Sequence, residues 1–282
     1  MQLSLNSVIL GEPLEFEEYL DLAGRTGFPG VDFGLNACLE IVEKEGVQAV
    51  RDLFEAHGVI PASWGIPVDW KGPEDSYRDT LADFPRWAET GVAVGCPRAC
   101  TWIPPAIDTD PDEFYEMAVR RWREIGQIAA DYGLRLGLEW VGPATLRAEG
   151  NEFIHTMDGL LEMERDIGLD NVGLLVDSFH WYTAGHSADE LAAVGVEKIV
   201  HVHINDAPDR PREEQIDGER LLPGEGIIDL QAFVGALDRA GYDGFMGIET
   251  FSDELKSLPA QEAARKAFEA GSRVLQSYEG AK

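Results

Sequence analysis

Short apolar runs alternate with longer amphipathic stretches along the whole chain, and this alternation limits what the chain can fold into. Such a pattern is typical of βα units and a parallel sheet. The apolar runs predict eight strands, at residues 2–9, 30–35, 60–67, 98–103, 135–142, 172–178, 199–205 and 244–250. The longer stretches predict eight helices, at residues 14–26, 39–57, 75–95, 111–132, 157–168, 187–195, 229–240 and 260–277. Eight such pairs in 282 residues favour one (β/α)₈ TIM barrel over residues 1–282, because these barrels typically take about 250 residues.

The chain carries no signal for an alternative α/β arrangement. No strand is followed by G-x-G-x-x-G, so an open dinucleotide-binding sheet has no support. No Ser- or Pro-rich linker divides the chain into two domains. One long irregular stretch, residues 206–228, lies between the seventh strand and its helix, and loops of this length are often functional. We therefore expect an active site at the C-terminal ends of the strands, with this loop beside it.

Charge and cysteine content exclude several classes of partner and environment. The chain has 23 Lys and Arg against 52 Asp and Glu, a net charge of −29, which argues against nucleic acid as a partner. It contains no run of 18 apolar residues, so we expect no membrane-spanning helix. The N-terminal segment lacks the features of a secretory signal, and three cysteines (Cys38, Cys96, Cys100) form no CxxC pair. We expect buried free thiols in a cytoplasmic protein.

Chemistry-bearing residues stand at the ends of the last four predicted strands. Glu139 ends the fifth strand, Asp177 the sixth and Glu249 the eighth, while His201 and His203 share one phase of the seventh. Side chains alternate between the two faces of a strand, so residues two apart point the same way. Four strands that are adjacent in a barrel would aim Glu139, Asp177, His203 and Glu249 at one point. Taken singly, each carboxylate could instead cap the following helix.

The set of three carboxylates and one imidazole suits a divalent cation, namely Mn²⁺, Mg²⁺, Co²⁺ or Zn²⁺. Gly137 and Gly247 are expected inside the barrel, where small residues leave room, and this phase also turns Glu139 and Glu249 inward. His201 lies one layer deeper than His203, so we expect it to be a core histidine rather than a ligand.

The residues Glu139, Asp177-x-x-His180, His201-x-His203 and Glu249 resemble the xylose isomerase-like barrels of sugar isomerases and epimerases. Asp177-Ser-Phe-His180, His203-Ile-Asn-Asp206 and the stretch PGEGIIDL at 223–230 are most similar to the inosose isomerase branch. The resemblance implies one metal ion on Glu139, Asp177, His203 and Glu249. It also implies that the two glutamates act as acid–base groups and that His180 holds a substrate oxygen. Such barrels often form homo-oligomers.

A common intermediate explains the reactions that such a site would catalyse. A metal that chelates a carbonyl and a neighbouring hydroxyl stabilises an enediolate. Proton transfer on both faces of the enediolate gives epimerisation, and transfer on one face gives isomerisation. We therefore predict a metal-dependent isomerase or epimerase of a ketose or keto-inositol. The alternative is an inosose-type dehydratase, because loss of a β-hydroxyl from the same enediolate gives dehydration.

Two other classes are weaker candidates. An endonuclease IV-like phosphoesterase needs many more histidines, and the second and third strands offer none. A non-catalytic sugar-binding barrel would not require two opposed glutamates. No glycine-rich phosphate cradle is present, so a small unphosphorylated sugar or polyol is the expected substrate.

Aromatic and basic residues near the strand ends are candidates for substrate contact. Trp64 and Trp102 follow strands where an aromatic wall could stack on a sugar ring, as do Trp140 and Trp181, although all four could equally pack beneath the helices. The 206–228 loop carries three arginines, Arg210, Arg212 and Arg220. Arg210 falls where epimerases of the resembling family place a substrate-contacting arginine.

Overall fold

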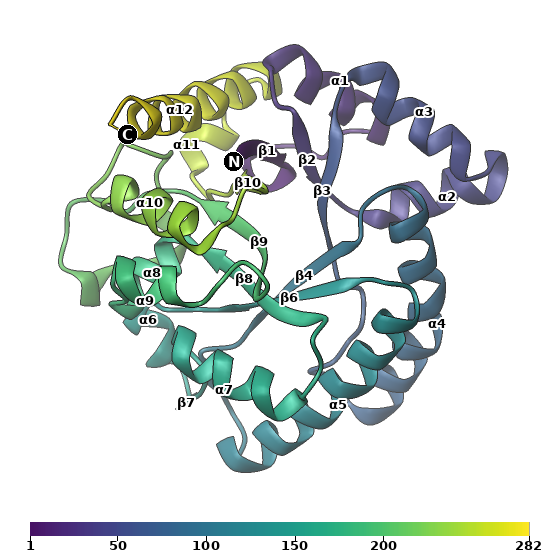
Figure 1. The fold of residues 1–282 in the computed structure, drawn as a ribbon, viewed down its shortest axis with the longest axis vertical. Coiled ribbons are helices and arrows are strands. Elements are labelled where there is room, and N and C mark those ends of the chain that lie inside the picture. The colour runs from purple at the N-terminus through teal and green to yellow at the C-terminus, as the bar shows by residue number, and fades with distance from the viewer. Residues whose placement is uncertain (282) are drawn as a thin grey trace.

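The computed structural model describes residues 1–281, and its main sheet is a closed parallel barrel of eight strands (Figure 1). The strands are β1 (Gln2–Asn6), β2 (Gly30–Phe33), β3 (Ile60–Gly65), β4 (Arg98–Ile103), β6 (Arg135–Trp140), β8 (Val172–Asp177), β9 (Ile199–Ile204) and β10 (Phe245–Ile248). They close in the order β1-β10-β9-β8-β6-β4-β3-β2. The (β/α)₈ barrel predicted from the alternation is confirmed.

Helices surround this barrel on its outside (Figure 1). They are α1 (Phe16–Thr26), α2 (Leu35–Glu45), α3 (Val47–His57), α4 (Glu74–Ala93), α5 (Pro111–Asp131), α6 (Ala144–Arg147), α7 (Met157–Ile167), α8 (Ser178–Ala184), α9 (Ala188–Ala193), α10 (Leu230–Ala240), α11 (Asp253–Lys256) and α12 (Ala260–Ala281). The single helix expected at 39–57 is wrong: α2 and α3 are separated by Gly46, whose φ of 90° ends the first helix.

Helix α5 illustrates how the sequence determines these elements. The Asp110 side chain accepts hydrogen bonds from the backbone N–H of Asp112 and Glu113, and Pro111 occupies the first helical turn. Trp122 and Ile125 on its inner stripe are fully buried. The helix therefore begins at a capping residue and presents one apolar face to the barrel.

The barrel strands are covered on both faces, which explains why they read as continuous apolar runs. Every residue of β8 and β9 is buried. The three cysteines are free and buried, as expected. Among the described residues, no helix combines the length and apolar character needed to cross a bilayer.

Asp206 closes the neck of the long loop that follows β9. Its carboxylate accepts hydrogen bonds from the backbone N–H groups of Ala207, Gly224, Gly226 and Ile228, at 2.8–3.0 Å. Its own backbone pairs with Leu221. A Cβ at position 226 would lie 2.1 Å from the Ala207 carbonyl oxygen, so only glycine allows this approach. Both ends of the loop are therefore fixed to one residue.

A small antiparallel sheet joins two other loops at the same end of the barrel. It pairs β5 (Ala106–Ile107) with β7 (Asn151–Glu152), from the connections after β4 and β6. Residues of β5 face the site described next.

Candidate active site

Four of the predicted strand-end residues meet at the C-terminal end of the barrel. Asp177 and His203 are register partners on β8 and β9, while Glu139 lies near the end of β6 and Glu249 directly follows β10. One ligand atom from each of the four lies within 4.8 Å of the others. The strand positions, which are far apart in sequence, thus bring these side chains to one point.

The geometry of this cluster fits a divalent cation. Oε1 of Glu139 and Nδ1 of His203 are buried and have no hydrogen-bond partner among the described residues. Nδ1 of His203 lies 3.4 Å from Glu249 Oε2 and 3.7 Å from Glu139 Oε1. Buried polar atoms without partners are costly, and a cation between them would satisfy both. Oxygen donors with one imidazole are also a ligand set that divalent metals accept.

Asp177 uses its two carboxylate oxygens differently. Oδ1 accepts the backbone N–H groups of Phe179 and His180 and so caps helix α8, which begins immediately after β8. Oδ2 accepts hydrogen bonds from Asn205 Nδ2 at 2.7 Å and from Arg220 at 3.2 Å. Asp177 therefore both caps helix α8 and belongs to the four-residue cluster. The hydrogen bonds of the cap fix the orientation of its carboxylate.

The two glutamates have different electrostatic surroundings. Burial raises the pKa of Glu139 above its ordinary value, and the nearby imidazole of His203 acts against this. Burial also opposes ionisation of Glu249, but His203 and Arg220 outweigh it and hold the pKa of that carboxyl below its ordinary value. Burial lowers the pKa of His203, whereas the carboxylates of Glu249 and Glu139 raise it well above its usual range.

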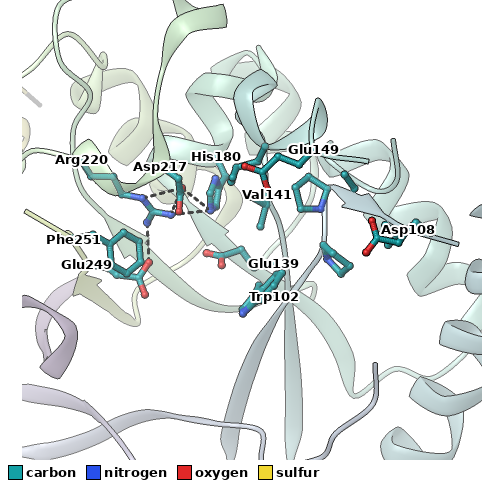
Figure 2. A pocket seen from close by; sticks show the side chains of 15 residues that line it. Trp102, Asp108, Glu139, Val141, Glu149, His180, Asp217, Arg220, Glu249 and Phe251 are labelled. Atoms are coloured by element: carbon teal, nitrogen blue, oxygen red, sulfur yellow. Dashed lines mark hydrogen bonds and ion pairs between the residues drawn. The ribbon is translucent and has the colours of Figure 1, made fainter. Parts of the chain in front are cut away.

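Arg220 brings a positive charge to this cluster from the long loop. Its Nη1 donates to Glu249 Oε2 at 2.8 Å, and its Nη2 donates to Asp217 Oδ1 at 2.7 Å (Figure 2). Nη2 also lies 3.0 Å from Nε2 of His180. The side chain is only 2% exposed, although it comes from a loop.

The structure does not bring Arg210 to the site, in contrast to the expectation from sequence. Its guanidinium pairs with Glu219 on the loop itself. The physical reason is the path of the loop. Asp206 accepts hydrogen bonds from Gly226 and Ile228 at the far end of the loop, and in this arrangement Arg220 reaches Asp177 and Glu249. Among the described residues, Arg220 is the arginine that lines the cavity.

A cavity of about 720 Å³ opens beside the cluster. Glu139, Glu249, His180 and Arg220 line its inner end, and Figure 2 shows these side chains around one space. Its apolar walls come from Trp102, Pro104, Pro105, Ile107, Val141, Leu146 and Phe251. Polar groups at one end and apolar walls around the rest are typical of a small-molecule site.

A second cavity of about 390 Å³ shares Glu139 and Glu249 with the first and is also lined by Trp64, Ser63 and Asp32. Trp102 lines both cavities, is 46% exposed and carries the ammonium of Lys71 over its ring at 3.4 Å. Trp64 is buried, and its indole N–H donates to the Cys96 carbonyl.

The other two tryptophans at the strand ends are packing residues. Trp140 donates its indole N–H to the His180 carbonyl, and Trp181 packs on Phe233. Neither lines the two cavities beside the glutamates.

Sequence reasoning missed Asp217, Phe251 and Asp32. Asp217 lies in the short helical turn η3 (Asp217–Glu219), and Phe251 follows Glu249. No local pattern distinguishes either from an ordinary loop residue. Asp32 does carry a signal, because it lies near the end of β2 just as Glu139 lies near the end of β6.

Comparisons with known proteins agree on one family. The model of the xylose isomerase-like TIM barrel family matches residues 20–278. A curated relative, the inosose isomerase of Bacillus velezensis, is 26% identical over 99% of this chain and 98% of its own.

Two solved structures are similar over 99% of both chains. A xylose isomerase domain protein from Alicyclobacillus acidocaldarius has a TM-score of 0.91 at 33% identity. The IolI protein with a bound zinc atom has a TM-score of 0.83 at 25% identity.

Proposed function

Because the chain belongs to the xylose isomerase-like TIM barrel family, we propose that it is a divalent-metal-dependent isomerase or epimerase of a ketose or keto-inositol. The similarity to inosose isomerase over nearly the whole chain supports this substrate class. The zinc bound to the IolI protein supports a metal-dependent reaction. Glu139, Asp177, His203 and Glu249 would hold the cation.

The observation that carries the proposal is the position of two glutamates against one imidazole. Carboxylate oxygens of Glu139 and Glu249 both lie within 3.7 Å of His203 Nδ1, and they enter from strands on different sides of β9. A non-catalytic sugar-binding barrel would not need two such bases in one cavity. A bound divalent cation would polarise a substrate carbonyl and offset negative charge on its oxygen.

The proton transfers belong to the two glutamates. One carboxylate removes the proton from the carbon next to the carbonyl, which gives an enediolate, and a carboxylate returns it to the same or the neighbouring carbon. Glu249 has the lowered pKa, so its carboxylate is ionised and is the weaker base of the two. Glu139 has the raised pKa and holds a proton more readily.

Binding and orientation fall to the side chains around the cavity. Arg220 and His180 face the inner end and would hold substrate oxygens, while Trp102 and Phe251 offer aromatic walls to the C–H faces of a ring. The guanidinium of Arg220 is already paired with Asp177, Asp217 and Glu249. Little free positive charge remains for a phosphate, which supports a neutral, unphosphorylated substrate.

The test is proton exchange in D₂O. The protein is stripped of metal, reloaded separately with Mn²⁺, Mg²⁺, Co²⁺ or Zn²⁺, and incubated with a panel of inososes and ketoses. We expect metal-dependent entry of deuterium with no change in the carbon skeleton. Loss of the mass of one water would identify a dehydratase instead. No exchange with any substrate under any metal would contradict the proposal and favour a binding protein.

A further inference from the structure

A buried polar layer lies beneath the four proposed metal ligands, and the proposed reaction uses none of its residues. It consists of Ser4 on β1, Asp32 on β2, Ser63 on β3 and His201 on β9, and we call it the Asp32 layer. Each of these side chains is buried. Such a polar group deep in a barrel is costly unless its partners are arranged around it.

The carboxylate of Asp32 is the centre of this layer. Ser4 Oγ donates to its Oδ2 at 3.2 Å, and Ser63 Oγ donates to its Oδ1 at 2.8 Å. Nε2 of His201 lies 3.0 Å from Oδ1. Two hydroxyl donors on β1 and β3 therefore hold the carboxylate, and the His201 ring lies against it.

Gly247 shows that Asp32 reaches across the barrel toward His203. A Cβ at position 247 would lie 2.0 Å from Oδ2 of Asp32 and 3.0 Å from Cδ2 of His203. Residue 247 is also the register partner of His203. The absence of a side chain at Gly247 therefore leaves the room in which Asp32 approaches the imidazole of His203.

Carboxylates lie near both ring nitrogens of His203. Nδ1 faces Glu139 and Glu249, whereas Nε2 faces Asp32 Oδ2 at 3.9 Å. Among residues 1–281, Asp32 is the only residue whose carboxylate lies within 4 Å of Nε2 of His203. A neutral imidazole has one N–H and one lone pair, and an ionised carboxylate can only accept. The negative charge of Asp32, 3.9 Å from Nε2, therefore favours the tautomer with its proton on that nitrogen.

His201 completes the layer without joining the ligands. Its ring meets that of His203 edge to face, with centroids 5.3 Å apart and planes at 88°. Neither of its ring nitrogens has a hydrogen-bond partner among the described residues. The ring thus supports both the Asp32 carboxylate and the orientation of His203.

We propose that Asp32 is a positioning residue for the metal centre: it keeps the His203 proton on Nε2 and leaves the Nδ1 lone pair free for the cation. The proposal rests on the proposed function, because it requires a cation held by His203 and the three carboxylates. A carboxylate behind a metal-bound histidine is a known way to orient the ring and raise its basicity.

The first test measures metal affinity rather than activity. Zn²⁺ and Mn²⁺ are titrated calorimetrically into metal-free wild type, Asp32→Asn and Asp79→Asn. Asparagine keeps the shape of the side chain but removes the negative charge that faces Nε2 of both histidines. We expect Asp32→Asn to bind about 10- to 100-fold more weakly. Asp79→Asn, the matched control, makes the same carboxylate-to-amide change at an exposed position of α4 and is expected to bind like wild type.

The second test needs no variant and therefore does not depend on how Asp32→Asn folds. Nitrogen-15 NMR of histidine-labelled, zinc-loaded wild type is expected to place the His203 proton on Nε2 and the metal on Nδ1. The reverse assignment would overturn the proposal. Equal affinity in wild type and a folded Asp32→Asn would also overturn it while leaving the proposed function intact.

Two further results separate this proposal from its alternatives. Two cations per chain in wild type, with the second lost in Asp32→Asn, would overturn it by showing that the Asp32 layer itself binds metal. No cation bound by wild type would instead refute the proposed function, and this proposal with it.

Discussion

Nη1 of Arg220 donates to Oε2 of Glu249 at 2.8 Å, whereas within the described part of the chain Arg220 forms no ion pair with Glu139. Two glutamates that face the same imidazole are therefore unequal, because one has a cationic partner and the other does not. This difference agrees with their pKa values, which move in opposite directions. It leads directly to the first prediction.

Replacing either glutamate by glutamine separates the two proton-transfer roles. For an epimerase, Glu249→Gln is expected to retain metal and still exchange one substrate proton with solvent through Glu139. Its net turnover is expected to fall by about 10²-fold or more. Glu139→Gln is expected to behave in the same way with the opposite epimer. Turnover is measured together with deuterium exchange at each carbon. If one variant stays near wild type, a single base suffices and the reaction is an isomerisation on one face.

Removing any one of the four proposed ligands is expected to weaken metal binding. Alanine at Glu139, Asp177, His203 or Glu249 is expected to lower the affinity at least about tenfold, because ligand bonds supply most of the binding free energy. Elemental analysis and metal titration measure this. His201→Ala removes a neighbour of the ligands and not a ligand, so it is expected to keep a bound cation and to lose less affinity than His203→Ala. Full occupancy in His203→Ala with an empty His201→Ala protein would show that the other histidine is the ligand.

The two loop arginines are expected to differ in function. Arg220→Met removes a charged donor that faces the cavity, so kcat/KM is expected to fall about ten- to a hundredfold. Arg210→Met breaks only a pair on the loop surface, and its kinetics are expected to match wild type. Arg220→Lys keeps the charge but not the several N–H donors of the guanidinium, so a kcat/KM between those of wild type and Arg220→Met is expected. Equal effects of Arg210→Met and Arg220→Met would contradict this assignment.

The loss of stability at acid pH is expected to depend on Glu74 in the first turn of α4. Hydrogen bonds from Arg121 at 2.8 Å and from Arg78 at 2.7 Å lower the pKa of Glu74 from 4.5 to about 2. Because the pKa is lowered on folding, the ionised carboxylate stabilises the folded state fully at pH values above about 4.5. This contribution is lost as the pH falls through about 2. Glu74→Gln is therefore expected to melt below wild type at neutral pH.

The same comparison at low pH tests the sign of the effect. The gap in Tm between wild type and Glu74→Gln is expected to close as the pH approaches about 2. Glu55→Gln, which removes an exposed carboxylate on α3, serves as control. A gap that stays constant with pH would show that the pair does not act through ionisation.

Salt is expected to stabilise the protein. The net charge of −29 repels itself across the surface, and added cations screen this repulsion. We expect Tm to rise between about 0.1 and 1 M KCl, where the screening length falls from about 10 to 3 Å. Chloride is preferred to sulfate, since sulfate also stabilises proteins by exclusion from their surface. A flat or falling Tm would mean that the acidic surface imposes no repulsive cost.

The strands and most helices could be predicted because each depends on local periodicity. Eight apolar runs became the eight barrel strands, with small differences at their ends. The helix break at Gly46 was missed, because a glycine inside an amphipathic pattern does not by itself reveal a positive φ. The helix α8 was also missed, since Asp177 both ends β8 and caps the helix that follows without a loop.

The candidate site was predictable only where strand phase determines it. Glu139, Asp177, His203 and Glu249 follow from their places at strand ends. Arg220 was considered, but Arg210 was preferred, because the path of the loop depends on the hydrogen bonds that Asp206 accepts from residues up to 22 positions away. Asp32 meets His203 only across the barrel interior, a contact that no local spacing encodes.

The single carboxylate that closes the neck of the 206–228 loop makes this loop a replaceable module. Since Asp206 binds the backbone at both ends, the intervening segment can gain or lose residues without moving β9 or helix α10. Arg220, which donates to Glu249 and Asp177, thus reaches the strand ends from a segment that is anchored separately from them. A relative's loop grafted at Asp206 is therefore expected to replace the cationic partner of Glu249 while the barrel strands keep their places.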